Sequence, residues 1–501
     1  LSGPFIAWLE HPQTLTAAAV PVVLLFTRRL SRGPTAPDLI GLVVSTYLVM
    51  SGGHPETQVM AALLGAAVLI RAAPSARAAV TPVAGALIGV ALAAPLLIPF
   101  VEYFVASQAR LGMDRRPFVL PLRDLQRFLF PRLPDTNLIE AASTVSLTVL
   151  ALAAAGLLRW RRDRRVPFWA AIAAIIAVVT YRNPLSLALA HHTPVYWTRA
   201  LLFLPLPLAY LASGALDALV QNTRARAGRT LARIVEIVAV LLVSGELLLA
   251  AQGVHGSARP SDLEKTTPLL DTLRADRSIF RVLPLHTFLP PDSASLYGLD
   301  DVRGYDALSP RRWRYQLEAI GRVSRAPTQL EVLEPWDLVA GGAALDDWNV
   351  KYLLLHPQFA FGAEELNAKK GLDLEQVYSG PDGRILRNRR VRPRARLSGE
   401  GRVDIDQSLP RLWSLRVEAN VASVLTLANP MFPGWTARID GRRVPVLGDA
   451  GEAMRLSLPP GVHRVEFLYV PASFRAGCWA ALGAILALVI LARRLPRERS
   501  A

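Results

Sequence analysis

The stretch Leu157-Leu158-Arg159-Trp160-Arg161-Arg162-Asp163-Arg164-Arg165 decides the fold class of this chain, because a dense group of arginines follows directly on an apolar run. The 501 residues are 52% hydrophobic, with a mean hydropathy of +0.30. A helix needs about 20 apolar residues to cross a hydrocarbon core about 30 Å thick. Nine hydrophobic segments are present, at about 14–27, 38–51, 56–70, 79–104, 142–158, 167–180, 199–216, 232–250 and 476–492. The longer ones can span a bilayer alone and the shorter ones among neighbouring helices, so the sequence predicts a polytopic α-helical membrane protein.

The arginines fall in alternate loops between these segments. They follow the first, third, fifth, seventh and ninth segments, as Arg28, Arg29 and Arg32; Arg71 and Arg77; Arg159, Arg161, Arg162, Arg164 and Arg165; Arg224, Arg226 and Arg229; and Arg493, Arg494, Arg497 and Arg499. Positive charge beside a span marks the cytoplasmic side, and one topology satisfies all five loops. It places residue 1 and residues 251–475 outside the cytoplasm of a multi-pass cell-membrane protein. Topology and anionic lipid headgroups then explain the net charge of +16, and we expect no nucleic-acid partner.

The chain divides into four parts on this basis. Residues 1–250 are a transmembrane helical region of about eight spans, 251–395 an extracytoplasmic α/β domain, 396–471 an extracytoplasmic β-sandwich, and 472–501 the last transmembrane helix with a basic cytoplasmic tail. The α/β domain is indicated by helical patterns at 268–276 and 310–322 and by strand patterns at 278–283 and 350–355.

The β-sandwich is indicated by short alternating strands. Residues 412–418, 435–439 and 462–467 alternate between apolar and polar, and the second run leads into the hairpin signal Asp440-Gly441. We expect Trp413 and Trp435 each to place one apolar face in the sandwich core, where buried aromatic rings are common. The alternative for Trp435 is an exposed ring that stacks on a sugar.

A very short outer loop, Gly52-Gly53-His54-Pro55-Glu56-Thr57, carries the first candidate chemistry. Ionisable groups at a membrane boundary are costly and often functional, which makes His54 and Glu56 candidate catalytic residues. The alternative is a tight turn between two helices, with glycine and proline as breakers and Glu56 as an acid favoured by the helix dipole.

The outer loop from Val105 to Ala141 has six arginines against four acids, and six minus four leaves +2 where positive charge should be scarce. Its apolar stretch 122–130 resembles a helix lying in the membrane interface. Arginine binds phosphate through two parallel hydrogen bonds, so Arg115, Arg116 and Arg127 are candidates for a lipid phosphate. The alternative is internal pairing of Arg123 or Arg127 with a nearby acid.

Arg199 lies at the outer mouth of a span that continues as Leu201-Leu202-Phe203-Leu204. A cation there invites an anionic partner, and the alternative is that its side chain reaches the lipid headgroups. The adjacent His191 and His192 point apart on a helix and have no visible third ligand, so we expect no metal site there. No cofactor pattern is evident, and a divalent metal ion is left open.

Several stretches resemble the YfhO-type family of bacterial membrane proteins. The most specific is the C-terminal run Phe432-Pro433-Gly434-Trp435, Ile439-Asp440-Gly441 and 460–471, followed by a terminal span. Residues 347–352 and 303–309 resemble parts of the family's outside domain, and Gly53-His54-Pro55-Glu56 resembles a short motif of its membrane region. Phe130-Pro131 and Arg199 are looser matches.

The resemblance implies a GT-C-like bundle, which is the architecture of membrane glycosyltransferases. Such enzymes take a sugar from a polyprenyl-phosphate donor and transfer it, on the outer face, to a cell-envelope glycan acceptor. Their catalytic acid lies in the first outside loop. The chain begins at Leu1 inside an outer loop, so we expect it to be a truncated form that lacks that acid. Glu56, Glu102 and Asp114 are then candidates for an assisting role.

Two classes of function remain open. The first is a membrane glycosyltransferase whose donor phosphate contacts Arg199, Arg115, Arg116 and Arg127 among membrane lipids. The second is a non-enzymatic envelope scaffold or transporter component. An inactive fragment without its catalytic loop is a third possibility.

Reporter fusions test the predicted topology. A reporter fused near Gly380 should be active outside the cytoplasm, and one fused near Asp163 should be active inside, because the arginine loops hold Asp163 on the cytoplasmic side. The reverse pattern at either position contradicts the topology.

Overall fold

The computed structural model describes residues 5, 9, 11–107, 118–128, 145–193, 195–252, 259, 261, 265–304, 306, 308–323 and 331–498. Arg115, Arg116 and Asp114 lie outside these residues. The chain forms two compact units. Unit 1 comprises Leu1–Ile98, Gly112–Ser257 and Ala476–Ala501, and unit 2 comprises Pro99–Leu111 and Ala258–Arg475.

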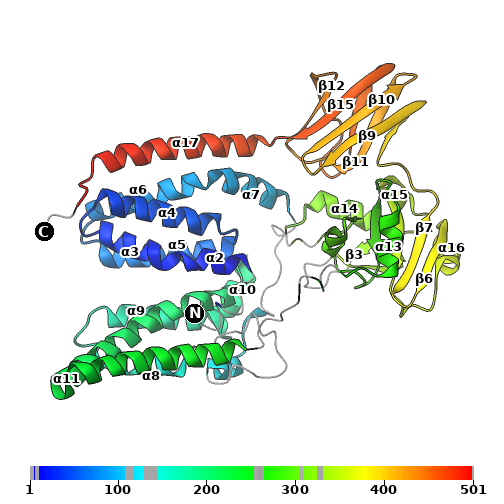
Figure 1. The fold of residues 1–501 in the computed structure, drawn as a ribbon. Coiled ribbons are helices and arrows are strands. Elements are labelled where there is room, and N and C mark those ends of the chain that lie inside the picture. Colours follow the sequence, from blue (N-terminus) through cyan, green and yellow to red (C-terminus); the bar gives the residue numbers. More distant parts are fainter. Residues whose placement is uncertain are drawn as a thin grey trace. The chain divides into compact units, whose positions relative to one another are not determined.

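Unit 1 is helical (Figure 1). Its helices are α2 (Pro12–Ala18), α3 (Val20–Leu30), α4 (Ala36–Ser51), α5 (Pro55–Ala72), α6 (Ala76–Leu92), the start of α7 (Ala94–Ala106), η3 (Leu122–Phe128), α8 (Leu147–Leu157), α9 (Val166–Thr180), α10 (Pro184–His192), η4 (Trp197–Phe203), α11 (Pro205–Ala251) and most of α17 (Ala472–Arg493). Several begin at a side-chain cap followed by proline. At α4, Thr35 accepts a hydrogen bond from the Asp38 N–H and Ala36-Pro37 opens the helix.

Among the described residues, two helical stretches are long and apolar enough to cross a membrane: Trp197–Ala251, which has a kink at Gly228, and α17. A third span is possible if α6 and α7 count as one, and α4, α8 and α9 are shorter apolar helices. Pro95 lacks the N–H that would continue the helix, which accounts for the break that divides the predicted segment 79–104 into α6 and α7. The nine-span count and its orientation stay predictions.

Two predicted spans, 199–216 and 232–250, differ in form from the expectation. The first begins as the 3₁₀ helix η4 and continues as α11, in which two helices meet at a kink at Gly228, between the arginines of the predicted loop. The interruption comes at Gly228, whose φ of 86° belongs to the left-handed region that favours glycine.

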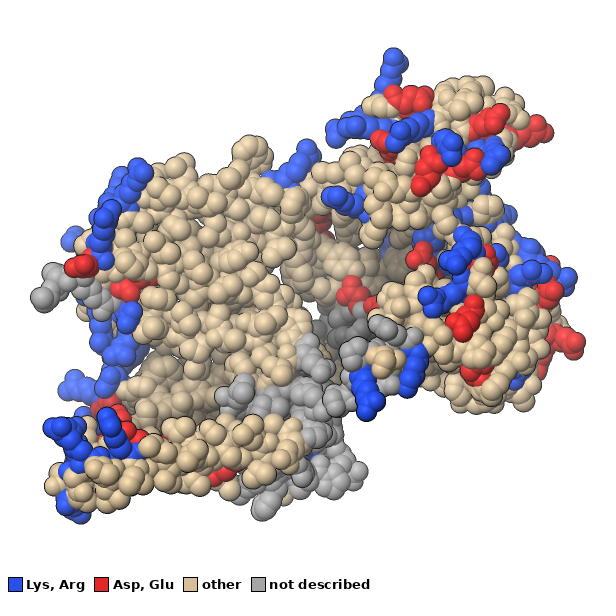
Figure 2. All heavy atoms as spheres, in the orientation of Figure 1, with Lys and Arg blue, Asp and Glu red and all other residues tan. Residues whose placement is uncertain are grey.

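Hydrogen bonds in unit 1 join arginine-bearing loops to one another, and join the predicted outer loops to one another. Ala36 N donates to Pro496 O at 2.9 Å, and Arg71 Nη2 donates to Arg164 O at 3.4 Å, so arginine-bearing loops lie beside one another. Figure 2 shows lysine and arginine gathered at the end of unit 1 where the C-terminal end of α17 lies. Two of the predicted outer loops also lie beside one another, because Arg182 N donates to Leu120 O at 2.8 Å. This grouping is the one that alternating spans require.

The α/β part of unit 2 is built on a five-stranded sheet in the order β2-β1-β5-β7-β6. Its strands are β1 (Arg281–Pro284), β2 (Asp300–Asp301), β5 (Val350–Leu355), β6 (Leu374–Gly380) and β7 (Gly383–Asn388). The remaining elements are α13 (Pro268–Ala275), η5 (Ser293–Tyr297), α14 (Arg311–Ile320), β3 (Gly321–Val323), β4 (Leu333–Leu338), α15 (Ala343–Asp347) and α16 (Ala363–Lys370). Leu283, Leu353 and Leu386 are fully buried in the core. The expected strand 350–355 and helices 268–276 and 310–322 are therefore present as β5, α13 and α14.

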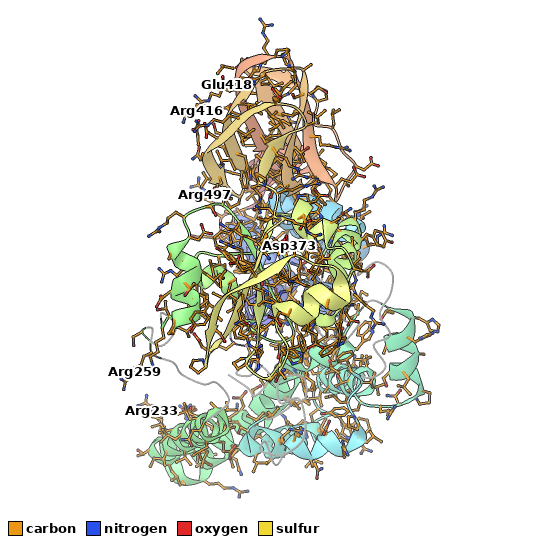
Figure 3. All side chains as sticks on the ribbon, turned by 90° about the vertical axis from the view of Figure 1, so that its right-hand side faces the viewer. Arg233, Arg259, Asp373, Arg416, Glu418 and Arg497 are labelled. Atoms are coloured by element: carbon orange, nitrogen blue, oxygen red, sulfur yellow. The ribbon has the colours of Figure 1, made fainter. Side chains whose placement is uncertain are left out.

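The sandwich of unit 2 consists of a five-stranded sheet, β13-β12-β15-β10-β9, and a three-stranded sheet, β14-β11-β8. Its strands are β8 (Ala395–Leu397), β9 (Gly401–Leu409), β10 (Leu412–Ala419), β11 (Ser423–Pro430), β12 (Trp435–Ile439), β13 (Arg442–Val444), β14 (Ala453–Leu458) and β15 (Gly461–Tyr469). Along β10, Trp413 and Val417 are buried, whereas Arg416 and Glu418, labelled in Figure 3, alternate with them on the outer face. Trp413 occupies the core as expected, and Trp435 is half-buried against it.

Phe467 provides a test of the sandwich core. It is fully buried on β15, whereas Val462 on the same strand is 75% exposed. Phe467→Ala should lower the free energy of unfolding of unit 2 by about 3–5 kcal/mol, because it removes buried surface and leaves a cavity. Val462→Ala is the matched control and should change little. Equal thermal-shift and proteolysis behaviour of the two variants contradicts this core.

Candidate functional site

The turn between α4 and α5 positions His54 and Glu56. A Cβ added at Gly52 would lie 2.8 Å from the Cα of Thr16, and Gly53 has a φ of +80°, so the turn needs both glycines. Pro55 then starts α5 with its φ already set for a helix. His54 becomes the residue that caps the helix, and Glu56 enters the first turn, where the helix dipole favours a negative charge.

The His54 ring lies between a threonine and an arginine. Its Nδ1 is 2.7 Å from Thr57 Oγ1, and its Nε2 is 2.9 Å from Arg199 Nη1. A guanidinium can only donate, so Nε2 accepts and the ring proton belongs on Nδ1, directed to the threonine hydroxyl. The Thr57 N–H lies 3.2 Å from Nδ1 and would favour the other tautomer. The Thr57 hydroxyl can donate or accept and so fits either tautomer, whereas the Arg199 contact is shorter than that of the Thr57 N–H and favours the proton on Nδ1.

The protonated form of His54 is strongly disfavoured. Burial, followed by the charge of Arg199 and then His11, lowers its pKa from 6.5 to about 3. At neutral pH the ring is therefore uncharged. A group with so low a pKa is a weak general base, which makes His54 better suited to hold Arg199 in place than to accept a proton from a substrate.

Arg199 makes the strongest polar contact of the cluster. Its Nη1 lies 2.6 Å from Glu56 Oε2, and the two side chains are only 12% and 16% exposed. Its guanidinium also lies over the Tyr196 ring, 4.7 Å from the centroid. Residues 143 positions apart in the sequence thus meet in one partly buried ion pair. The structure brings together Arg199, Glu56 and His54, three of the predicted site residues.

Arg127 is 2% exposed, and its Nε donates to Asp124 Oδ1 at 3.3 Å. This contact is the internal pairing that we considered as the alternative to phosphate binding. Glu102, in the part of α7 that belongs to unit 2, accepts a hydrogen bond from Ser473 Oγ at 2.5 Å. Its described contact is therefore with the start of α17, and a role for it at the His54 cluster has no support here.

Two residues of the cluster were not singled out from the sequence. Thr57 had no distinguishing signal, because its role depends on the helix cap. Tyr196 has the ordinary composition of a membrane-interface aromatic, and only its spacing from Arg199 along one turn of chain could have indicated the contact. Within the described residues, no group of three or more His, Cys, Asp or Glu side chains could hold a metal ion.

Comparisons with known proteins place few limits on this chain. No family model and no curated protein matches it. Among solved structures, it is similar to the arabinofuranosyltransferase AftD from Mycobacteria, with 12% identity and a TM-score of 0.39. The match covers 94% of this chain and 48% of that one, so the present chain spans about half the length of the solved protein. Likeness at this level has no bearing on function, and the resemblance to YfhO-type proteins stays a prediction.

The titration of His54 tests the geometry of the cluster. We expect its ring to stay neutral well below pH 6.5, since its pKa is about 3. The unfolded chain then binds a proton that the folded chain does not, so His54 should lower stability as pH falls from 6.5 toward 3. Arg199→Gln should raise the pKa of His54 but leave it below 6.5, because burial is the larger cause. Histidine-labelled NMR of the purified protein measures both values, and ordinary titration near 6.5 in the parent contradicts the cluster.

Proposed function

We propose that this protein is a GT-C-like membrane glycosyltransferase that takes a sugar from a polyprenyl-phosphate donor and gives it to a cell-envelope acceptor. The observation that supports this proposal most is the partly buried cluster of Arg199, Glu56 and His54, at the ends of apolar helices. A donor of this class has a lipid tail that needs the bilayer and a phosphate that needs a cation at its edge. Arg199 provides such a cation at a position that is predicted to lie at a membrane boundary.

The ion pair has a role in this proposal. Without donor, Glu56 holds the guanidinium in one orientation and balances its charge. When the lipid phosphate arrives, it replaces the carboxylate on Arg199, because a planar guanidinium binds either oxyanion through parallel hydrogen bonds. The released Glu56 carboxylate is then close to the phosphate-bearing end of the donor. His54, held by Thr57, keeps Arg199 from following Glu56.

In the transfer step, an acceptor hydroxyl oxygen forms a bond to the anomeric carbon of the sugar. The bond from that carbon to the phosphate oxygen breaks, and lipid phosphate leaves with the electron pair. The hydroxyl proton goes to a carboxylate. Glu56 is the candidate among the described residues that can assist in taking it. Arg199 stabilises the negative charge that collects on the leaving phosphate.

Three variants of the full-length protein test the proposal. Arg199→Ala should lower lipid-phosphate binding and sugar transfer at least about tenfold, since charge-assisted pairs contribute about 1.5–3 kcal/mol. Arg199→Lys should restore only part of this, because an ammonium has no fork of donors. Glu56→Gln should keep binding but slow transfer. Transfer is measured with purified protein in vesicles containing a polyprenyl-phosphate sugar.

Arg182→Ala is the matched control, because Arg182 belongs to the same outer loop and is exposed. It should behave as the parent does. If Arg199→Ala transfers sugar as well as the parent, the proposed donor site is wrong. If the full-length parent binds glycans but transfers no sugar from any donor tested, the scaffold function replaces the enzyme.

A further inference from the structure

Unit 2 contains a cavity of about 710 Å³ that plays no part in the donor site. All its lining residues belong to this one unit, from the end of α7, the start of α14 and the sandwich. Six aromatic side chains line it: Tyr103, Trp313, Tyr315, Phe432, Trp435 and Tyr469. Sugar rings have apolar faces that stack on such side chains, whereas their hydroxyls need polar partners at the rim. The aromatic side chains of the cavity meet the first of these requirements.

The C-terminal motif of the sequence builds one wall of this cavity. Gly434 has a φ of +112°, and a Cβ there would lie 2.9 Å from the Cα of Pro471, so only glycine allows the chain to turn at this point. Val470 N donates to Gly434 O at 2.8 Å and closes the corner. The corner brings Trp435 and Tyr469 together, with ring centroids 5.4 Å apart. Trp435 is half-buried, so it both packs on the sandwich core and lines the cavity.

The polar atoms at the cavity favour a negatively charged ligand. Arg311 and Arg312 line it, and the lining residues that the structure describes include no carboxylate. Arg312 has a loose contact of 3.8 Å with Asp449, both of them largely exposed. Among the described residues, Arg311 has no ion-pair partner. Arg311 and Arg312 therefore give this wall of the cavity a positive potential, of which the Arg312 part is solvated, and an acid beside the lining, Asp306, accepts a hydrogen bond from Tyr103.

Asn429 adds to this potential from deeper in the unit. Its Oδ1 accepts hydrogen bonds from Arg281 Nη2 at 3.2 Å and Arg394 Nη2 at 3.0 Å, and both arginines are buried. This leaves the amide NH₂ as the group that Asn429 can offer to the cavity that it lines. The nearby Asp300 is 3.6 Å from Arg394 and has a side chain 59% exposed. The positive charges of Arg281 and Arg394 beside Asn429 are thus balanced only in part by the exposed Asp300.

We propose that this cavity binds a saccharide that carries a negatively charged group. The aromatic rings would stack on the sugar faces, Arg311 and Arg312 would pair with the carboxylate or phosphate, and Asn429 would donate to a hydroxyl. Tyr469 lies three residues before Ala472, where the candidate membrane helix α17 begins. Only Val470 and Pro471 separate this part of the cavity wall from that helix in the sequence. In the function proposed above, the bound saccharide is the acceptor glycan, and the site would serve a scaffold equally.

Binding is tested with the full chain in lipid nanodiscs, because alkyl-glycoside detergents would compete for a sugar site. The probes are tetragalacturonate for a carboxylate, glucose 6-phosphate for a phosphate, and maltotetraose as a neutral control, each followed by saturation-transfer NMR and calorimetry. At least one charged probe should bind more tightly than maltotetraose. Trp435→Ala should weaken it about tenfold or more, as for a central aromatic anchor.

Tyr315→Ala and Arg311→Ala guard against loss of folding, since Tyr315 is 63% exposed and neither packs in the core. Tyr315→Ala should weaken all sugars, whereas Arg311→Ala should weaken only the charged ones. Trp336→Ala and Arg322→Ala, at exposed positions of unit 2 outside the lining, should bind as the parent does.

Arg199→Ala should also leave this binding unchanged, so failure of the donor site and failure of this site are distinguishable. The inference is overturned if neither charged probe binds. It is equally overturned if the three cavity variants bind like the parent, or if a polyprenyl lipid occupies the cavity in preference to every sugar.

Discussion

The contact between Arg199 and Glu56 is the interaction on which the membrane part of this protein depends. It joins the turn before α5 to the start of η4, across 143 residues, in a place where both side chains are mostly shielded from water. Removal of either partner would leave a charge in poorly solvated surroundings, which is far more costly than loss of an exposed pair. Gly52, Gly53 and Pro55 are needed for the turn that makes the contact possible. The proposed donor site and the packing of the turn before α5 therefore both depend on the Arg199–Glu56 ion pair.

Unit 2 has a comparable constraint, formed by buried guanidinium groups. Arg281 donates to the carbonyls of Trp348 and Ala428 and so connects the α/β sheet to the sandwich. Burial lowers the pKa of Arg394 to about 10, although its cation still lies over the Trp413 ring. Arg303 forms a fully buried pair with Asp301. These contacts build the frame of unit 2 from buried guanidinium groups.

The sequence could predict the parts of the fold that depend on periodicity and charge. Alternation along β10 and β15 predicts strands, and the arginine loops predict which helix ends meet. The break between the spans 199–216 and 232–250 is present at Gly228, but the first helix extends through Arg224 and Arg226, because arginine is a good helix former and loop assignment from charge ignores that. The break between α6 and α7 was missed because the apolar run continues through Pro95 without a polar residue. The candidate site, too, was predicted from the sequence only in part. The positions of His54, Glu56 and Arg199 at helix ends were readable from the sequence. Pairing of Arg127 with an acid was considered, but the choice between that and phosphate binding depends on the local 3₁₀ turn that brings Asp124 to it.

The central claim is that Arg199 exchanges its carboxylate partner for a lipid phosphate. A cryo-electron microscopy structure of the full-length protein in nanodiscs, determined with and without polyprenyl phosphate, tests it most directly. The account predicts that the phosphate lies within hydrogen-bond distance of the Arg199 guanidinium and that Glu56 has moved away from it, with His54 in place. A phosphate bound elsewhere, with the Arg199–Glu56 pair intact in both structures, would contradict it.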